Sequence, residues 1–125
     1  MSNLLEQYIP IIGESVIDDL KLIADKLKGK IIQHINSTAV GGGVAEILSR
    51  MVPLLRELGV DARWDLIKGG DQFFDVTKKF HNALHGSPVE ITKRDFEIFM
   101  ETSQKNIEEV NTYGDILFIH DPQPI

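Results

Sequence analysis

The residues best suited to chemistry are three consecutive glycines, followed by histidines and carboxylates at the ends of short apolar segments. Gly41, Gly42 and Gly43 open directly into an amphipathic segment that begins at Val44. Glycine permits positive φ and close approach of the backbone, and the N–H groups at the start of a helix attract anions. The triplet therefore predicts a loop that binds a phosphate or a sugar hydroxyl. The alternative is a tight turn that binds nothing.

The glycine loop matches neither of two common phosphate-binding patterns. A dinucleotide fingerprint needs a further glycine where Glu46 stands, and a Walker loop needs a Gly-Lys-Ser/Thr sequence that does not follow. Asp61 and Asp65, near the second apolar segment, imitate the acidic ribose ligand of a dinucleotide site. We expect neither carboxylate to have that role.

Two histidines have a spacing that is found in some metal sites. His81 and His85 are four residues apart in a predicted helix, so both can lie on one face. No third ligand is evident, and we expect neither a metal nor a cofactor. The alternative is that one imidazole faces solvent and the other lines a cleft.

A second histidine pattern lies at the end of the last apolar segment. His120 and Asp121 precede Pro122, at a strand end where side chains of a parallel sheet face a ligand. A His-Asp pair before proline is equally typical of an ordinary turn. His34 and Trp64 lie inside apolar segments, and we interpret both as interior residues.

Hydrophobic spacing predicts the elements that must position these residues. Helical spacing covers residues 13–28, 44–58, 71–86 and 93–110, and short apolar runs predict strands at 30–37, 60–67 and 115–120. Ser15 or Glu14 stands near the start of the first helix, and caps are expected at Asp71 and at Thr92. Pro53 lies inside the second helix and should bend it.

The alternation of strands and helices predicts an α/β fold, a Rossmann-like three-layer sandwich with about three parallel strands. The loops at the carboxyl ends of the strands, at 36–43, 68–71 and 121–124, would then lie along one edge of the sheet. Ligands of open parallel sheets bind at that edge. The predicted site is therefore built from these loops.

Composition restricts the class of protein. The 125 residues are 42% apolar and 26% charged, which is typical of one globular domain. The formal net charge of -6, with no basic stripe, argues against a nucleic-acid partner. Without cysteine, a signal-like start or a long apolar run, we expect a cytoplasmic protein that does not enter a membrane.

Three segments in fixed order carry a resemblance to a known family. They are HINSTAVGGGVAEILSRMVPLLRELGVDARW, FFDVTKKFHNALHG and FIHDPQP. From about Tyr8 to its end, the chain resembles the N-terminal domain of trehalose glycosyltransferring synthases, and trehalose phosphorylases share parts of the pattern. The resemblance implies a GT-B enzyme that makes trehalose reversibly from UDP- or ADP-glucose and glucose.

The resemblance also implies roles for particular residues. Gly41 to Gly43 would lie beside the donor phosphate and sugar. The acceptor side would be lined by five residues, namely His81, Asn82, His120, Asp121 and Gln123. The family's C-terminal domain, which holds the nucleotide sugar, is absent from this sequence, so we expect no turnover by the chain alone.

Three functions remain open at this point. One is a truncated or split glycosyltransferase domain with weak sugar or phosphate affinity. Another is a self-associating structural or interaction module, in which a second copy covers the exposed strand Ile116 to Ile119. The third is a phosphate- or nucleotide-binding regulatory domain on the flavodoxin-like plan.

Overall fold

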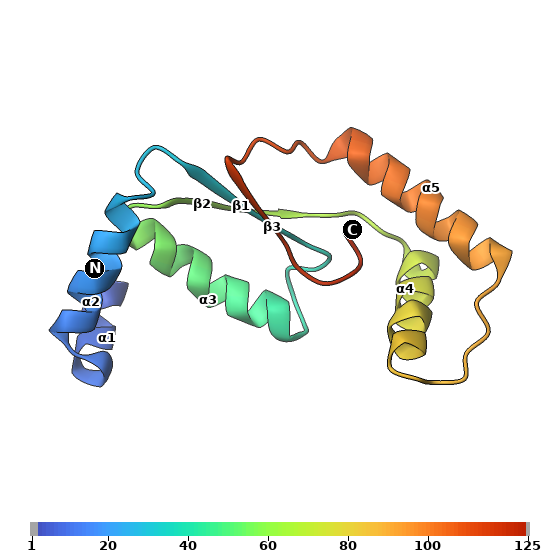
Figure 1. Cartoon of the computed structure of the whole chain (residues 1–125), viewed down its shortest axis with the longest axis horizontal. Helices are drawn as coiled ribbons and strands as arrows, with labels where there is room; N and C mark the ends of the chain where they lie inside the picture. Colours follow the sequence, from blue (N-terminus) through green and yellow to red (C-terminus); the bar gives the residue numbers. More distant parts are fainter. Residues whose placement is uncertain (1–2, 125) are drawn as a thin grey trace.

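The computed structural model describes residues 3–124, and within them the chain alternates between helices and parallel strands. The elements are α1 (Leu4–Ile12), α2 (Glu14–Asp25), β1 (Ile31–Asn36), α3 (Gly43–Glu57), β2 (Asp61–Leu66), α4 (Asp71–Leu84), α5 (Lys93–Glu109) and β3 (Ile116–Ile119). Figure 1 shows α1 and α2 at one end of the molecule and α4 and α5 at the other, with the sheet and α3 between them.

The isoleucine-rich strand β1 lies at the centre of the sheet, whose order is β2-β1-β3. Both neighbours run parallel to it, and His34 is in register with Trp64 of β2 and Phe118 of β3. The parallel sheet with helices between its strands confirms the predicted Rossmann-like α/β fold. The carboxyl ends of all three strands therefore lie along one edge.

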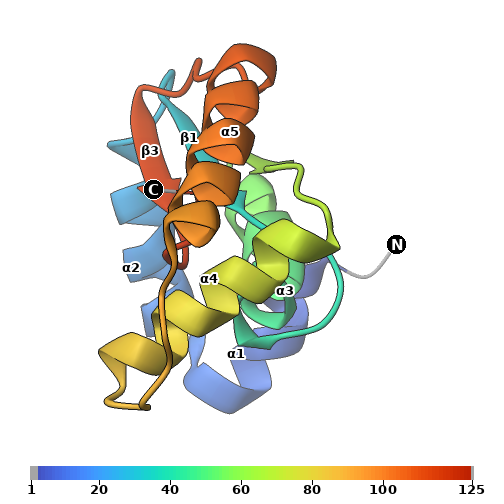
Figure 2. The same cartoon turned by 90° about the vertical axis from the view of Figure 1, so that its right-hand side faces the viewer.

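Alternate residues of β1 serve two separate cores. Ile32 packs with Leu48 and Val52 of α3, whereas Ile35 packs with Ile67 and Phe73 at the start of α4. Figure 2 shows α4 and α5 on the side of the molecule away from the N-terminal helices. These two cores hold α3 and the start of α4 against the sheet.

Helix α1 was not expected from the sequence, because Glu6 and Pro10 interrupt its apolar run. Asn3 caps it by accepting a hydrogen bond from the N–H of Leu5, and Glu57 of α3 accepts another from the N–H of Leu4 at 2.9 Å. Pro10 lies in the last turn of the helix. Tertiary contact with α3 thus stabilises a helix that periodicity did not indicate.

The predicted N-terminal caps of the helices are confirmed only in part. Thr92 caps α5 in a capping box with Asp95, as expected. The cap expected at Asp71 is wrong, because α4 begins after Gly70, which forms no side-chain cap. Helix α2 begins at Glu14, as expected, and follows Gly13, whose φ of 86° favours glycine.

Asp95 links α5 to α4. Its carboxylate accepts hydrogen bonds from the backbone N–H of Thr92 at 2.8 Å and from Lys79 at 2.9 Å. The Thr92 N–H, followed by the Lys79 ammonium and the Thr92 hydroxyl, lowers the pKa of Asp95 to about 2. The pair of helices is therefore fastened by an ionised carboxylate.

Helix α3 continues through Pro53 to Glu57, so packing outweighs the hydrogen bond that proline removes. The bend expected at this position stays a prediction. Within residues 3–124, no helix combines the length and apolar character needed to cross a membrane.

The loop before β3 is held by a buried glutamine of β1. Gln33 is fully buried, and its amide donates to Asp65 of β2 at 2.9 Å and to the carbonyl of Asn111 at 2.8 Å. Its Oε1 accepts from the N–H groups of Tyr113 and Gly114, both at 3.1 Å. One side chain thereby joins β2, β1 and the entry to β3.

Strand β3 is exposed along its whole length. The exposed fractions of its four residues run from 37% at Ile116 to 49% at Phe118. The expectation that the last strand is poorly covered is therefore confirmed.

Candidate functional site

Three segments that are distant in sequence meet around one hollow of about 360 Å³ at the carboxyl edge of the sheet. The first is the loop after β1, which supplies Thr38 and residues 41–45. The second is α4, which supplies Phe74, Thr77, Lys78 and His81. The third is the turn after β3, residues 121–123. This is the edge where parallel sheets bind ligands.

The glycine loop is shaped by backbone conformation rather than by crowding. Gly41 and Gly42 have φ angles of 79° and 83°, which residues with a side chain rarely adopt. A Cβ at Gly41, Gly42 or Gly43 would meet no atom within 4 Å. The loop therefore presents bare backbone to open space.

The N-terminus of α3 opens toward this space. Gly42 is its N-cap, and among residues 3–124 no side-chain cap bonds to the N–H groups of the first turn. These groups carry the positive end of the helix dipole. An anion or a hydroxyl oxygen in the hollow can accept hydrogen bonds from them.

The base of the loop is fixed by the buried Asn36 at the end of β1. Its Nδ2 donates to the carbonyl of Thr38 at 2.7 Å, and its Oδ1 accepts from the Trp64 indole N–H at 2.6 Å. Thr38 Oγ1 in turn donates to the carbonyl of Val40 at 2.7 Å. The interior role expected of Trp64 is confirmed, because it packs on the α3 core and anchors Asn36.

Helix α4 contributes polar groups to the opposite wall. Lys78 and His81 line the hollow, and both are exposed. The rings of His81 and His85 are 4.2 Å apart, and His85 Nδ1 lies 2.8 Å from the carbonyl oxygen of His81. Among residues 3–124, no group of three or more His, Cys, Asp or Glu residues could hold a metal ion.

The turn after β3 is held in an uncommon conformation. The N–H of His120 donates to the carbonyl of Ile35 at 2.9 Å, which extends the pairing with β1 by one residue. Asp121 then has a φ of 66°, the single positive value among non-glycine residues of the described chain. Strained residues of this kind persist where surrounding contacts fix them, and they cluster at functional sites. Gln123 follows with a buried Oε1 that has no partner within the described structure.

His34 lies behind this turn and is less fully bonded than we expected. It is 2% exposed, its Nδ1 is 3.0 Å from His120 Nε2, and its buried Nε2 has no partner within the described residues. Burial, and then the proximity of His120, lower the pKa of His34. The residue is interior, as predicted, but it is also connected to the site.

The structure brings together most of the predicted site residues. Gly41 to Gly43, His81, Asp121 and Gln123 all line the hollow, whereas His120 and Asn82 are not among its lining residues. His120 bonds to His34 instead. Asn82 is the neighbour of His81 on α4.

Asp61 and Asp65 have structural partners in the sheet, and the expectation that they bind no ribose stays a prediction. Asp61 pairs with Arg63 at 2.9 Å, and Asp65 accepts from Gln33 and from the Tyr113 hydroxyl, the latter at 2.7 Å. Among the polar lining residues of α4, Thr77 and Lys78 were not predicted. They precede His81 by four and three residues, so helical spacing could have found them.

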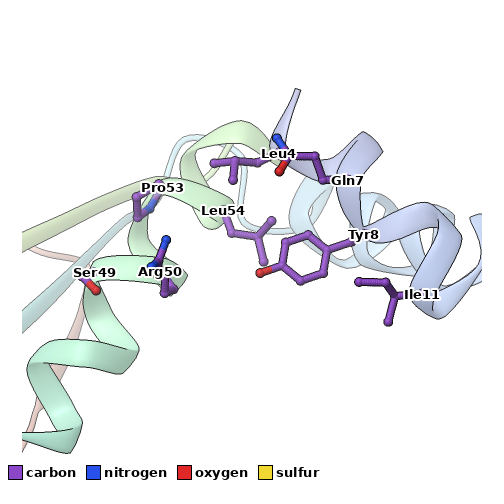
Figure 3. A pocket seen from close by; sticks show the side chains of 8 residues that line it. All are labelled: Leu4, Gln7, Tyr8, Ile11, Ser49, Arg50, Pro53 and Leu54. Atoms are coloured by element: carbon purple, nitrogen blue, oxygen red, sulfur yellow. The ribbon is translucent and has the colours of Figure 1, made fainter. Parts of the chain in front are cut away.

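A separate hollow of about 390 Å³ lies between α1 and α3, away from the predicted site residues. Figure 3 shows the Tyr8 ring extending from α1 toward Leu54 and Arg50 of α3. The lining consists of Leu4, Gln7, Tyr8, Ile11, Ser49, Arg50, Pro53 and Leu54. None of these described lining residues is acidic, and none belongs to the glycine loop or to the turn after β3.

Comparison with known proteins gives one consistent result. Residues 34–125 match the family model described as "Trehalose synthase, N-terminal domain". The chain is 48% identical over 122 residues to a trehalose synthase of Thermococcus litoralis, an alignment that covers 96% of this chain and 30% of the relative.

More distant relatives include a second trehalose synthase and a phosphorylase. The identity is 42% over 123 residues to a trehalose synthase of Rubrobacter xylanophilus, covering 96% of this chain and 30% of the relative. The identity to a trehalose phosphorylase of Pleurotus pulmonarius is 30% over 132 residues, an alignment that covers 95% of this chain and 18% of the relative. The chain thus spans less than a third of the length of these curated relatives.

Proposed function

Because this chain belongs to the family of trehalose synthase N-terminal domains, we propose that its hollow is one side of a glucosyl-transfer site. The observation that carries the proposal is the meeting of the glycine loop, His81 and the Asp121–Gln123 turn around one space. These are parts of the three sequence segments that resemble the family. Convergence of three distant segments on one hollow is typical of a ligand site.

The chemistry of the lining fits a sugar and an anionic donor. The Asp121 carboxylate accepts hydrogen bonds from hydroxyl groups, and the Gln123 amide both donates and accepts. The Gln123 Oε1, buried and without a partner among residues 3–124, is an acceptor that a sugar hydroxyl would satisfy. The free N–H groups at the start of α3 suit a donor phosphate.

Accordingly, His81, Asp121 and Gln123 are proposed to contact the acceptor glucose. His120 is proposed to act by holding the turn, and Asn82 is retained as a family expectation for the acceptor side. The donor would be UDP- or ADP-glucose, held between this domain and a second lobe in the GT-B arrangement. Glucosyl transfer needs accurately positioned groups on both sides of the sugar. We therefore expect the 125-residue chain alone to bind its ligands without turnover.

A calorimetric titration with glucose, trehalose and UDP-glucose tests this proposal. Asp121→Asn removes a charged acceptor, whose hydrogen bond contributes about 1.5 to 3 kcal/mol, so trehalose affinity should fall about 10- to 100-fold. Asp19→Asn is the matched control, because Asp19 is exposed on α2. Equal affinities for the native protein and Asp121→Asn would contradict the assignment.

The donor side is tested by the same titration with a glycine variant. Gly42→Val should abolish the contribution of the loop to UDP-glucose binding, because valine cannot adopt the backbone of Gly42 without strain. Binding of phosphate or UDP with no affinity for either sugar would favour the regulatory nucleotide-binding domain. If the native protein binds none of these ligands, the proposal is contradicted.

A second candidate function is favoured by the exposure of β3. A groove of about 220 Å³ runs along this strand and α5, with Leu117, Ile119, Ile107 and Val110 in its lining. The second edge of β3 pairs with no strand of the described chain. We propose that a second copy covers this edge, since exposed apolar strands favour pairing.

Sedimentation of the native protein at micromolar concentration tests self-association. A dimer that becomes monomeric in Leu117→Lys, but not in Val40→Lys, would support it. Val40 is the matched control, because it is 86% exposed in the glycine loop and away from β3. A native monomer would refute it.

A further inference from the structure

The least explained contact in the molecule is the pairing of two imidazoles behind the turn that lines the hollow. His34 Nδ1 and His120 Nε2 are 3.0 Å apart and join residues 86 positions apart in sequence. The planes of the two rings are 22° apart and their centroids are 5.3 Å apart, so the rings lie nearly edge to edge, and the Phe118 ring lies at the same distance from His34. These contacts restrict rotation of His120, so the pairing has a fixed geometry.

The unpaired nitrogen of His34 selects one arrangement of protons. His34 Nε2 is buried and has no partner within the described structure. An orphaned buried N–H is rarer and less favourable than an orphaned acceptor. The proton of neutral His34 therefore belongs on Nδ1, which donates to His120 Nε2. His120 must then carry its own proton on Nδ1.

An added proton conflicts with this arrangement. If His120 gains a proton on Nε2, both facing nitrogens carry hydrogens and the bond breaks. The bond can survive only if His34 accepts through Nδ1, which moves its own proton to the buried Nε2. Either way the protonated pair lacks a satisfactory hydrogen-bond arrangement.

Few charged groups near the pair could stabilise its protonated form. The β-strand neighbours of His34 are Trp64 and Phe118, which carry no charge. Beyond His120 the nearest charged group along the chain is Asp121, and Lys78 and His81 of α4 face it across the hollow. On α3, Glu46 is exposed at the glycine loop. Burial and His120 are the causes that lower the pKa of His34, so the buried ring favours its neutral form.

We propose that His34 is a positioning residue whose hydrogen bond to His120 holds the Asp121–Gln123 turn against the hollow only while the pair is neutral. The bond fixes the side chain of His120, and the bond from its N–H to Ile35 fixes its backbone. The next residue is Asp121 with its left-handed backbone. Loss of the imidazole bond should therefore loosen the turn. The part of this inference that concerns sugar affinity rests on the proposed function.

Nitrogen NMR of the labelled 125-residue protein, recorded between pH 7.5 and 5.0, tests the pair directly. The expected result is that His34 carries its proton on Nδ1 at pH 7.5, and that the amide signals of residues 119–123 shift on acidification. In His34→Asn these amides should shift less than in the native protein, because an asparagine amide can present nitrogen to neutral His120 and oxygen to protonated His120, which leaves only the direct effect of the added charge.

Two further variants separate the hydrogen bond from ring packing. Phe118→Leu keeps both nitrogens and should respond to pH as the native protein does. His34→Leu should show the loosened turn at both pH values. Should His34→Leu not fold, the comparison of the native protein with His34→Asn decides. A proton on His34 Nε2, or the same acid response in His34→Asn as in the native protein, would overturn the proposal.

Trehalose titrations of the native protein and His34→Asn connect the pair to the site. If one proton is linked to binding, native affinity should weaken by up to about tenfold per pH unit as the pH falls from 7.5 to 5.0, whereas His34→Asn should lose less affinity. If no sugar binds to either protein at pH 7.5, the proposed function fails. The tautomer and the amide shifts still decide the role of His34 in that case.

Discussion

Replacement of Gln33 by leucine is the most informative test of how this sheet is held together. The side chain is fully buried and forms four hydrogen bonds, two donated and two accepted. Its partners lie on β2 and on the loop before β3. Leucine has a similar volume, so the change removes the hydrogen bonds without opening a large cavity.

The expected loss follows from the number of bonds and the exposure of the partners. Each bond contributes about 0.5 to 1.5 kcal/mol net, so four bonds give about 2 to 6 kcal/mol. Asn111 and Tyr113 are exposed and can regain water, which favours the lower half of that range. We expect a loss of about 2 to 4 kcal/mol in the free energy of unfolding. In urea this should lower the midpoint by about 1 to 3 M.

A glutamate variant supplies the matched control. Gln33→Glu keeps the oxygen that accepts from Tyr113 and Gly114, but it places a carboxylate where Nε2 now lies 2.9 Å from Asp65. Like charge and burial should raise its folded pKa above the unfolded value of about 4.3. The folded state then binds more protons, so this variant should be closest to native stability below about pH 4 and lose stability as pH rises.

Urea unfolding at pH 4 and pH 7 measures these effects, and amide exchange at Tyr113 and Gly114 localises them. Both amides should exchange faster in Gln33→Leu. The reasoning is refuted if that variant lies within about 1 kcal/mol of the native protein, or if the deficit of Gln33→Glu is independent of pH.

Three other predictions concern stability. The folded pKa of Asp95, about 2, lies below its unfolded value near 3.9, so its stabilisation is present above that value and lost as pH falls toward 2. Thermal unfolding between pH 5 and 2 should therefore show a shallower acid loss in Asp95→Asn, and an equally steep loss would count against the assignment. Leu48→Ala should lower the free energy of unfolding by about 3 to 5 kcal/mol, because Leu48 has no exposed surface. On the same helix Ile47 is 61% exposed, and Ile47→Ala should change the free energy of unfolding by less than about 0.5 kcal/mol. Similar losses in Leu48→Ala and Ile47→Ala would contradict this account of the packing. Gly42→Ala should destabilise by about 1 to 2 kcal/mol through strain at φ 83°. Gly43 is the first residue of α3, has no positive φ and also faces open space, so Gly43→Ala should be neutral or stabilising. Equal losses in the two variants would show that strain at Gly42 is not the cause.

Local patterns predicted most of the elements but not all of their ends. The spacing of apolar residues located α2, α3, α4, α5 and all three strands to within a few residues. It missed α1, whose contact with Glu57 depends on α3 being in place. It also placed a cap at Asp71 where Gly70 ends the loop, because a capping residue type does not show which residue begins the helix.

The candidate site was predictable where its chemistry is carried by residue type. The glycine triplet, His81 and the Asp121–Gln123 turn were identified from the sequence, and the fold brings them together. Thr77 and Lys78 were overlooked, since nothing in their own types marks them as site residues. Asn82 was included through the family resemblance, but it does not line the hollow.

By itself, the sequence determined the α/β class, the number of parallel strands and the positive-φ glycine loop, because periods of 2 and 3.6 residues and glycine's freedom are local properties. The tertiary structure alone decided that β1 lies between β2 and β3. That order sets His34 against His120 and Gln33 against the loop before β3. Such contacts join residues 80 or more positions apart, and they arise from strand order and helix packing, which no local pattern encodes.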